Sequence, residues 1–143
     1  MGMRRVAIRL KIRLVRGGRS IDVVALINSS YETREPELLV STAIATQLSV
    51  YPQLPEGAVV KEYRLADGSI TKLIKIPRAV QVYAVEEDRI VGSVEASLVI
   101  AEKANEPSIS NKLAGKLGIA ALDFSEGLWC FRDEIDKVIR KTK

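Results

Sequence analysis

The sequence predicts a mainly β protein, a small closed β-barrel or sandwich with two or three short helices. Roughly seven to nine short strand-like segments follow one another at about ten-residue spacing, and glycine-containing turns separate several of them. Two further segments carry the apolar spacing of short helices. The chain has 143 residues, 47% of them hydrophobic, which suffices for one domain with a buried core. We therefore expect a single domain over residues 1–143, with its core over about 5–131 and a helical tail over 132–143.

The first element is an alternating segment near the N-terminus. Apolar side chains occupy every second position there: Val6, Ile8, Leu10, Ile12 and Leu14. A period of two is typical of a strand with one buried and one solvated face. Gly17-Gly18 follows and supplies the positive φ angles of a tight turn, so we expect residues 19–27 to return as the antiparallel partner.

A short helix and further strands follow. Ser41 is a suitable N-cap for a helix of about two turns that ends near Ser49. The apolar face of this helix comprises Ala43, Ile44, Ala45 and Leu48. After a loop over residues 51–57, strands over 59–66 and 69–76 flank Asp67-Gly68, a strong hairpin signal. Two more strands are predicted over residues 79–85 and 90–100.

The C-terminal part predicts a second helix, a last hairpin and a short tail helix. The second helix begins at Glu106-Pro107-Ser108 and ends at Gly118, and its apolar face comprises Ile109, Leu113 and Leu117. The last hairpin pairs residues 119–124 with 128–131, and we expect its aromatic residues Trp129 and Phe131 in the core. Asp133 can cap the tail helix, whose inward side chains are expected to be Ile135, Val138 and Ile139.

The composition excludes several chemistries. Cys130 is the only cysteine and the chain has no histidine, so it has no intrachain disulfide, no thiol-imidazole metal cluster, no Ser-His-Asp triad and no Cys-His dyad. Carboxylate chemistry, lysine chemistry or pure binding remain, and we predict neither a metal nor a cofactor. No apolar run approaches the roughly 20 residues of a membrane-spanning helix, so we expect no membrane association and a cytoplasmic protein.

Positive charge is concentrated at the N-terminal end. Residues 1–19 carry seven basic groups and no acidic one. These groups can form the solvated face of the first strand, or they can form a surface for nucleic acid. The strand lacks the aromatic side chains on which single-stranded nucleic acid stacks, which favours the first interpretation.

The segment Val23–Tyr31 reads VVALINSSY, an apolar run that ends in small polar residues. It resembles the active-site strand of the retropepsin-like aspartic peptidases, which ends in Asp-Thr-Gly or Asp-Ser-Gly. In this chain the triplet is Asn28-Ser29-Ser30. Three further segments are similar to parts of that family: Leu39–Leu48 to its short helix, Leu65-Ala66-Asp67-Gly68 to a hairpin of microbial members, and Ser108–Ile119 to its closing helix. Pro107-Ser108-Ile109 departs from the family pattern by losing a glycine.

The resemblance implies a retropepsin-like barrel that forms a homodimer, with two loops meeting on a two-fold axis. Asn28 takes the position of the catalytic aspartate, and an amide cannot act as the general base. Losing one positioned acid-base group costs about 10²–10⁴ in rate, and this dimer would lose both. The resemblance implies that Ser29 holds the loop across the dimer axis, while at Ser30 a side chain replaces the family's glycine and is expected to narrow the cleft. The alternative is that Ser29 and Ser30 are ordinary turn residues that bond the local backbone. Leu65, Ala66, Asp67 and Gly68 are the candidates for a flap over the substrate.

Three functional hypotheses follow. The first is a catalytically inactive homodimer of retropepsin-like fold that binds extended peptides or a protein partner. The second is an active aspartic peptidase, which requires that Asn28 is deamidated or replaces an aspartate by engineering. The third is a nucleic-acid-associated protein that uses the basic first strand and the C-terminal tail.

Overall fold

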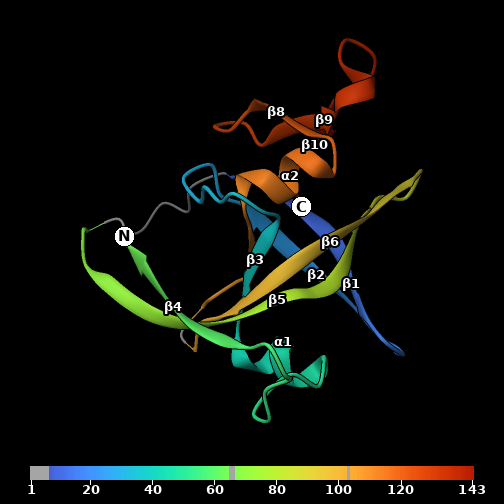
Figure 1. Ribbon diagram of the computed structural model, residues 1–143. Coiled ribbons are helices and arrows are strands. Elements are labelled where there is room, and N and C mark those ends of the chain that lie inside the picture. Colours follow the sequence, from blue (N-terminus) through green and yellow to red (C-terminus); the bar gives the residue numbers. More distant parts are fainter. Residues whose placement is uncertain (1–6, 65–66, 103) are drawn as a thin grey trace.

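A computed structural model describes residues 7–64, 67–102 and 104–143 (Figure 1). The described chain is mainly β. Its largest sheet contains β1 (Arg9–Arg16), β2 (Arg19–Ile27), β3 (Glu37–Val40), β4 (Val59–Arg64), β5 (Ile70–Val85), β6 (Ile90–Ile100) and β7 (Ser108–Ile109). The other elements are α1 (Thr42–Gln47), α2 (Asn111–Lys116), β8 (Ile119–Asp123), β9 (Leu128–Phe131), a 3-10 helix (Arg132–Glu134) and β10 (Arg140–Lys141).

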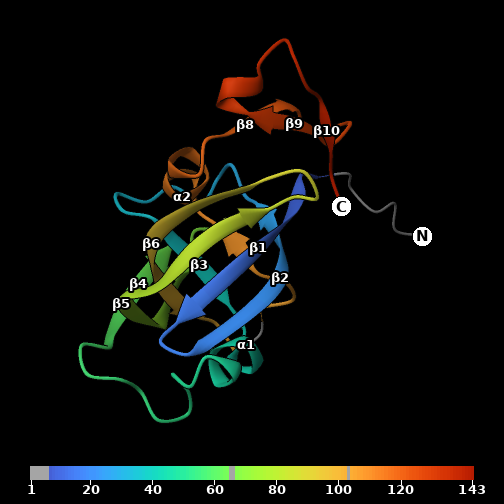
Figure 2. The ribbon, with the colours of Figure 1, turned by 90° about the vertical axis from the view of Figure 1, so that its right-hand side faces the viewer.

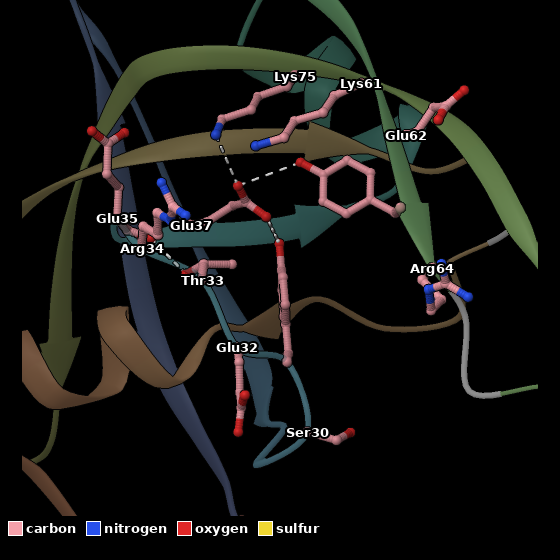
Figure 3. Close-up of a pocket in the computed structure, with 12 residues that line it drawn as sticks. Ser30, Glu32, Thr33, Arg34, Glu35, Glu37, Lys61, Glu62, Arg64 and Lys75 are labelled. Carbon is pink, nitrogen blue, oxygen red and sulfur yellow. Dashed lines mark hydrogen bonds and ion pairs between the residues drawn. The ribbon is translucent and has the colours of Figure 1, made fainter. Parts of the chain in front are cut away.

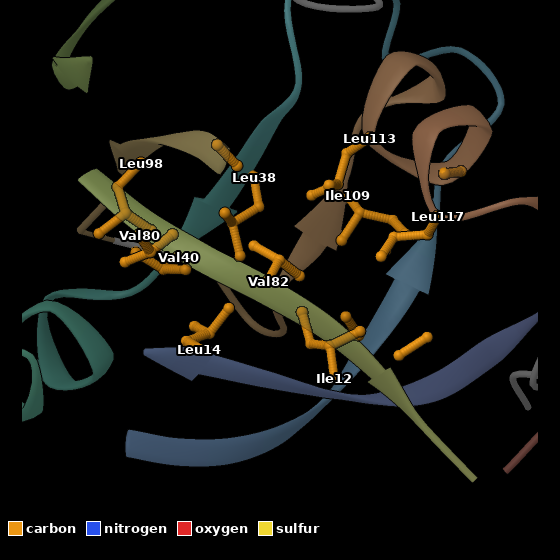
Figure 4. Close-up of a cluster of buried hydrophobic side chains, with 14 of the residues drawn as sticks. Ile12, Leu14, Leu38, Val40, Val80, Val82, Leu98, Ile109, Leu113 and Leu117 are labelled. Atoms are coloured by element: carbon orange, nitrogen blue, oxygen red, sulfur yellow. The ribbon is translucent and has the colours of Figure 1, made fainter. Parts of the chain in front are cut away.

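The seven strands follow the order β1-β2-β7-β3-β6-β5-β4, and β1 also pairs with β5. Six strands therefore form a ring, and β4 lies outside it. Apolar side chains from these strands meet those of α2 in the main core (Figure 4): the labelled residues include Ile12, Leu38, Val82, Ile109 and Leu113. The small sheet of β8, β9 and β10 lies beyond α2, whereas α1 lies at the opposite end of the molecule (Figures 1 and 2).

The first hairpin confirms the sequence prediction. β1 and β2 pair antiparallel around Gly17, whose φ is +56°. Leu10, Ile12 and Leu14 are fully buried, as their alternation predicted. The basic side chains between them lie on the other face of the strand.

β3 and β7 are short strands that sequence analysis did not identify. β3 pairs parallel with β6 and antiparallel with β7, while β7 pairs parallel with the end of β2 at Leu26 and Ile27. This pairing corrects the start of the second helix. Ser108 and Ile109 form the strand β7, and α2 begins at Asn111, where the Ser110 hydroxyl accepts a hydrogen bond from the Leu113 amide. The first helix, by contrast, starts at the predicted N-cap Ser41.

β5 corrects a second prediction. The segments 69–76 and 79–85 were expected as two strands, but they form one strand that continues through an irregularity between Ile76 and Val80. Pro77 has no amide hydrogen to donate at this point, and Arg78 has a φ of +47°, which lets the strand bend without ending. β4 and β5 form the hairpin predicted around Asp67-Gly68. Leu65 and Ala66 lie outside the described residues.

The predicted tail helix is wrong. After the 3-10 helix, Asp136 takes a φ of +69°, and the chain turns into β10, which pairs with β9. Ile135, Val138 and Ile139 are exposed rather than inward. Asp133 and Glu134 form ion pairs with Arg89, and Glu134 also accepts a hydrogen bond from the Phe131 amide at the start of the 3-10 helix, so Asp133 makes a tertiary contact instead of the predicted cap. Trp129 and Phe131 are buried as expected, in an edge-to-face contact.

Candidate functional site

The Asn28 loop follows directly after β2. The Asn28 Oδ1 accepts hydrogen bonds from the Ser30 amide at 3.1 Å and from the Ser30 hydroxyl at 2.7 Å. The Asn28 carbonyl accepts a third hydrogen bond, from the Tyr31 amide at 3.0 Å. Both serines are exposed. The asparagine side chain therefore shapes a local turn, a role for which Asn is well suited.

Asn28 lines a groove of about 460 Å³ between its own loop and the β4–β5 hairpin, which we call the Asn28 groove. β4 contributes Tyr63 and Arg64, β5 contributes Leu73, and β3 contributes Leu39. Its other lining residues are Ser30, Tyr31 and Ser108. None of the described residues that line this groove carries a carboxylate. The groove therefore offers apolar and hydrogen-bonding contacts but no acid-base pair of its own.

The predicted site residues are only partly brought together. Asn28 and Ser30 line the Asn28 groove, whereas Ser29 is not among the described residues that line it. Asp67 and Gly68 also lie outside that described lining. The Asp67 carboxylate accepts hydrogen bonds from the Ser69 hydroxyl and amide, which lower the pKa of this aspartate. Asp67 is thus explained by its turn. The hairpin covers the groove through residues of its strands, not through these turn positions.

Sequence analysis missed a buried carboxylate beside the groove. Glu37 on β3 is only 2% exposed. The Tyr31 hydroxyl donates to Glu37 Oε2 at 2.5 Å, the Lys75 ammonium lies 3.2 Å from Oε1, and the Tyr63 hydroxyl lies 3.4 Å from Oε1 (Figure 3). Charges at this depth are tolerated when they are paired and hydrogen-bonded. We call these four residues the Glu37 cluster.

The electrostatics of the Glu37 cluster keep both phenols protonated. Burial raises the pKa of Tyr31 and of Tyr63 well above the ordinary value, and the neighbouring Glu37 carboxylate raises both further. The phenols therefore act as hydrogen-bond donors to Glu37 and not as bases. One weak signal was present in the sequence: Glu37 directly precedes the apolar run Leu38–Val40, so a charge begins a buried strand.

A second cavity of about 550 Å³, which we call the Glu37 pocket, adjoins the Asn28 groove. Its walls include Glu37, Lys75, Lys61 and Arg34. The two cavities share four lining residues: Ser30, Tyr31, Tyr63 and Arg64. A molecule in the groove can therefore extend a side chain into the pocket.

The basic face of the first hairpin is largely paired. Arg13 makes two hydrogen bonds to Asp22, at 2.7 and 3.0 Å, and these lower the pKa of the Asp22 carboxyl. Arg9 binds Glu106 in the same two-pronged way, at 2.9 and 3.1 Å. Guanidinium groups held by carboxylates are less free to bind phosphate. This arrangement favours the interpretation of the segment as a solvated strand face.

Among the described residues, no group of three or more His, Cys, Asp or Glu side chains is placed to hold a metal ion. In the same described part of the chain, no helix has the length and apolar character needed to cross a membrane.

Comparisons of the chain with protein-family models, with curated proteins and with solved structures found no match.

Proposed function

We propose that the chain has the retropepsin-like fold, forms a homodimer, and binds extended peptides without cleaving them. One observation supports this proposal: Asn28, which by the resemblance takes the position of the catalytic aspartate, lines the Asn28 groove, and the described lining of that groove contains no acid. The order of elements supports the fold. A hairpin leads into the loop, a second hairpin covers it, and β7 with α2 returns beside the end of β2.

The groove lacks the chemistry of an aspartic peptidase. That mechanism needs two carboxylates that share one proton, one of them acting as a base toward water. The Asn28 amide cannot accept the proton, and its oxygen already accepts two hydrogen bonds from Ser30. Glu37 lines the adjoining Glu37 pocket, but Lys75 and Tyr31 hold its two oxygens in a buried position. Glu37 is thus a structural carboxylate and not a substitute base.

Strand addition is the binding mode that suits this groove. In the seven-stranded sheet, β4 stands at the end of the strand order, with β5 as its neighbour. Among the described strands, none pairs with the other edge of β4, whose backbone donors and acceptors an extended peptide can pair with. Leu39 and Leu73 supply apolar contacts in the groove for alternate side chains of that peptide. The combination gives backbone-driven binding with modest side-chain selectivity.

Cleavage and binding can be separated with one set of internally quenched eight-residue peptides. We expect binding to the wild-type protein, measured by fluorescence anisotropy, and no cleavage between pH 4 and 7. A Leu73→Lys variant should bind at least about tenfold more weakly, because a charge replaces an apolar contact, whereas the exposed Lys72→Ala variant serves as the control. Intact-mass analysis must show that Asn28 is not deamidated. Cleavage by that verified protein would overturn the proposal.

The homodimer is tested by sedimentation equilibrium. We expect a mass of twice the 15.8 kDa chain. An Asn28→Asp variant that gains cleavage only at concentrations where the dimer forms would show that two loops share one site. A protein that stays monomeric at all concentrations would remove the shared site and leave a groove formed by a single chain.

A further inference from the structure

We propose that the Glu37 pocket receives the carboxylate of an acidic side chain, Glu or Asp, from the peptide held in the Asn28 groove. This inference rests on the proposed function, because the peptide is the source of the acidic group. It assigns a selectivity that the groove alone does not provide.

One pair of charges inside the pocket already neutralises itself. Glu37 is 2% exposed and Lys75 has a side chain that is 13% exposed, and their charged groups lie 3.2 Å apart. The Glu37 carboxylate therefore neutralises Lys75. Any further cation in the pocket adds positive charge that Glu37 does not balance.

Three further basic residues line the pocket: Arg34, Lys61 and Arg64. Figure 3 shows the nitrogens of Arg34 and Lys61 directed toward the side of the cavity where the Glu37 carboxylate lies. Among the described residues, neither Arg34 nor Lys61 forms an ion pair with a carboxylate. Lys61 is held near the pocket by the Tyr63 ring, whose centroid lies 6.0 Å from its ammonium nitrogen. An ammonium and a guanidinium therefore lack an anionic partner.

The acidic residues of the pocket do not cancel this charge at its centre. Glu32, Glu35 and Glu62 also line the pocket and are exposed. In Figure 3 the side chains of Glu32 and Glu62 turn away from the Glu37 carboxylate, in opposite directions. Arg34 and Lys61 are exposed as well, so it is their orientation toward the Glu37 carboxylate, and not a greater depth, that favours an anionic group beside them.

The connection to the groove identifies where that anion comes from. Tyr31 and Tyr63 stand between the two cavities and line both. Their hydroxyls bind Glu37, so they present fixed walls to an entering side chain. In this proposal, a Glu side chain of the peptide lies alongside these walls, with its carboxylate toward Lys61. Charge-assisted hydrogen bonds of this kind are the strong ones.

The test uses a scanning library of eight-residue fluorescein-labelled peptides in which Glu, Gln, Lys or phosphoserine occupies each position in turn. At one position we expect Glu to bind about tenfold more tightly than Gln. Lys61→Ala and Arg34→Ala should each reduce that preference, because each removes a positive charge from the pocket. Both side chains are exposed, so their removal leaves the core intact. Lys72→Ala, which removes a charge outside the described lining of the pocket, should retain it.

A second measurement keeps the outcomes distinct. N-acetylglutamate α-amide, titrated into the ¹⁵N-labelled protein, should shift the amide resonances of Lys61 and Tyr63, whereas N-acetylglutamine α-amide should not. Peptides that bind with no preference for Glu over Gln would overturn the pocket assignment and leave the proposed function standing. Binding of the small acid at the pocket without any peptide binding would overturn the proposed function and leave standing only the assignment of the pocket as a carboxylate site. Failure of both probes would remove both proposals, and a preference for phosphoserine alone would overturn the carboxylate class.

Discussion

Glu37 shows how one residue can determine the character of a site. Its carboxylate lies at the edge of β3 with Lys75 and two phenols around it, and all four groups are needed to hold a charge at this depth. The same contacts orient Tyr31 and Tyr63 between the two cavities. Glu37 thus stabilises the fold and also fixes the positions of Tyr31 and Tyr63, which line the groove.

Replacing Glu37 by Gln should destabilise the protein. The substitution keeps the shape but leaves the Lys75 ammonium buried without its partner, which costs about 3 kcal/mol. Urea denaturation at neutral pH, followed by the fluorescence of the buried Trp129, measures this free energy of unfolding. Glu35→Gln is the matched control, because Glu35 is exposed and forms no ion pair among the described residues. Equal stability of the two variants would contradict the paired-charge account.

At this scale the sequence reveals part of the site. Asn28 and Ser30, to which the resemblance of one contiguous segment pointed, do line the Asn28 groove. Glu37 could not be identified, because its charge partner Lys75 lies far along the chain and only the pairing of β3, β6 and β5 brings the two together. The nucleic-acid hypothesis arose because charge is visible in the sequence while pairing, such as that of Arg13 with Asp22, is not.

Individual elements show the same division between local and tertiary causes. The hairpin around Gly17 was predictable because a turn and an alternating pattern are both local. The boundary between β7 and α2 was not, because Ser108 suits a helix start and Ile109 fits the apolar face of that helix, and the two form a strand only through their pairing with β2 and β3. The prediction of a tail helix was wrong because of a similar tertiary contact: Asp133, predicted as a cap, binds Arg89.

The N-cap of α2 should matter more than that of α1. The fully buried Ser110 hydroxyl accepts from the Leu113 amide and from the Glu37 amide, both at 3.2 Å, so Ser110→Ala leaves two buried donors unpaired. We expect a loss of about 2 kcal/mol in the free energy of unfolding. Ser41→Ala is the comparison, since the half-buried Ser41 caps only the Ile44 amide, and its loss should stay below about 1 kcal/mol. Chemical denaturation of both variants measures the difference, and the reverse order would refute this account.

For the whole molecule, a network of charges joins the two sheets. Arg140 on β10 binds Asp88, in the turn between β5 and β6, with two contacts of 2.8 Å, and binds Glu134 at 2.6 and 2.9 Å. Its guanidinium also lies over the rings of Phe131 and Trp129, at 5.1 and 5.7 Å. The small sheet is therefore fixed to the end of the β5–β6 hairpin as well as to α2.

This network predicts a loss of stability in acid. The hydrogen bonds from Arg140 lower the pKa of Glu134 from 4.5 to about 2. Because the folded pKa lies below the unfolded one, the stabilisation is complete above about pH 4.5 and disappears as the pH falls through about 2. Denaturation curves between pH 6 and 2 should show a smaller pH dependence for Glu134→Gln than for the wild type. Glu126→Gln, at an exposed position, should retain the wild-type dependence.

The length of β5 has a mechanical consequence. Residues 81–84 are held on both sides, by β1 and by β6, whereas residues 70–73 pair only with β4 among the described strands. From Ile74 outward, the hairpin over the Asn28 groove therefore extends beyond the ring. Lys75 lies where β5 pairs with both β4 and β6, and Tyr63 lies on the outer part of the hairpin. The hydrogen bond from Tyr63 to Glu37 therefore ties that outer part to β3, at the ion pair between Glu37 and Lys75.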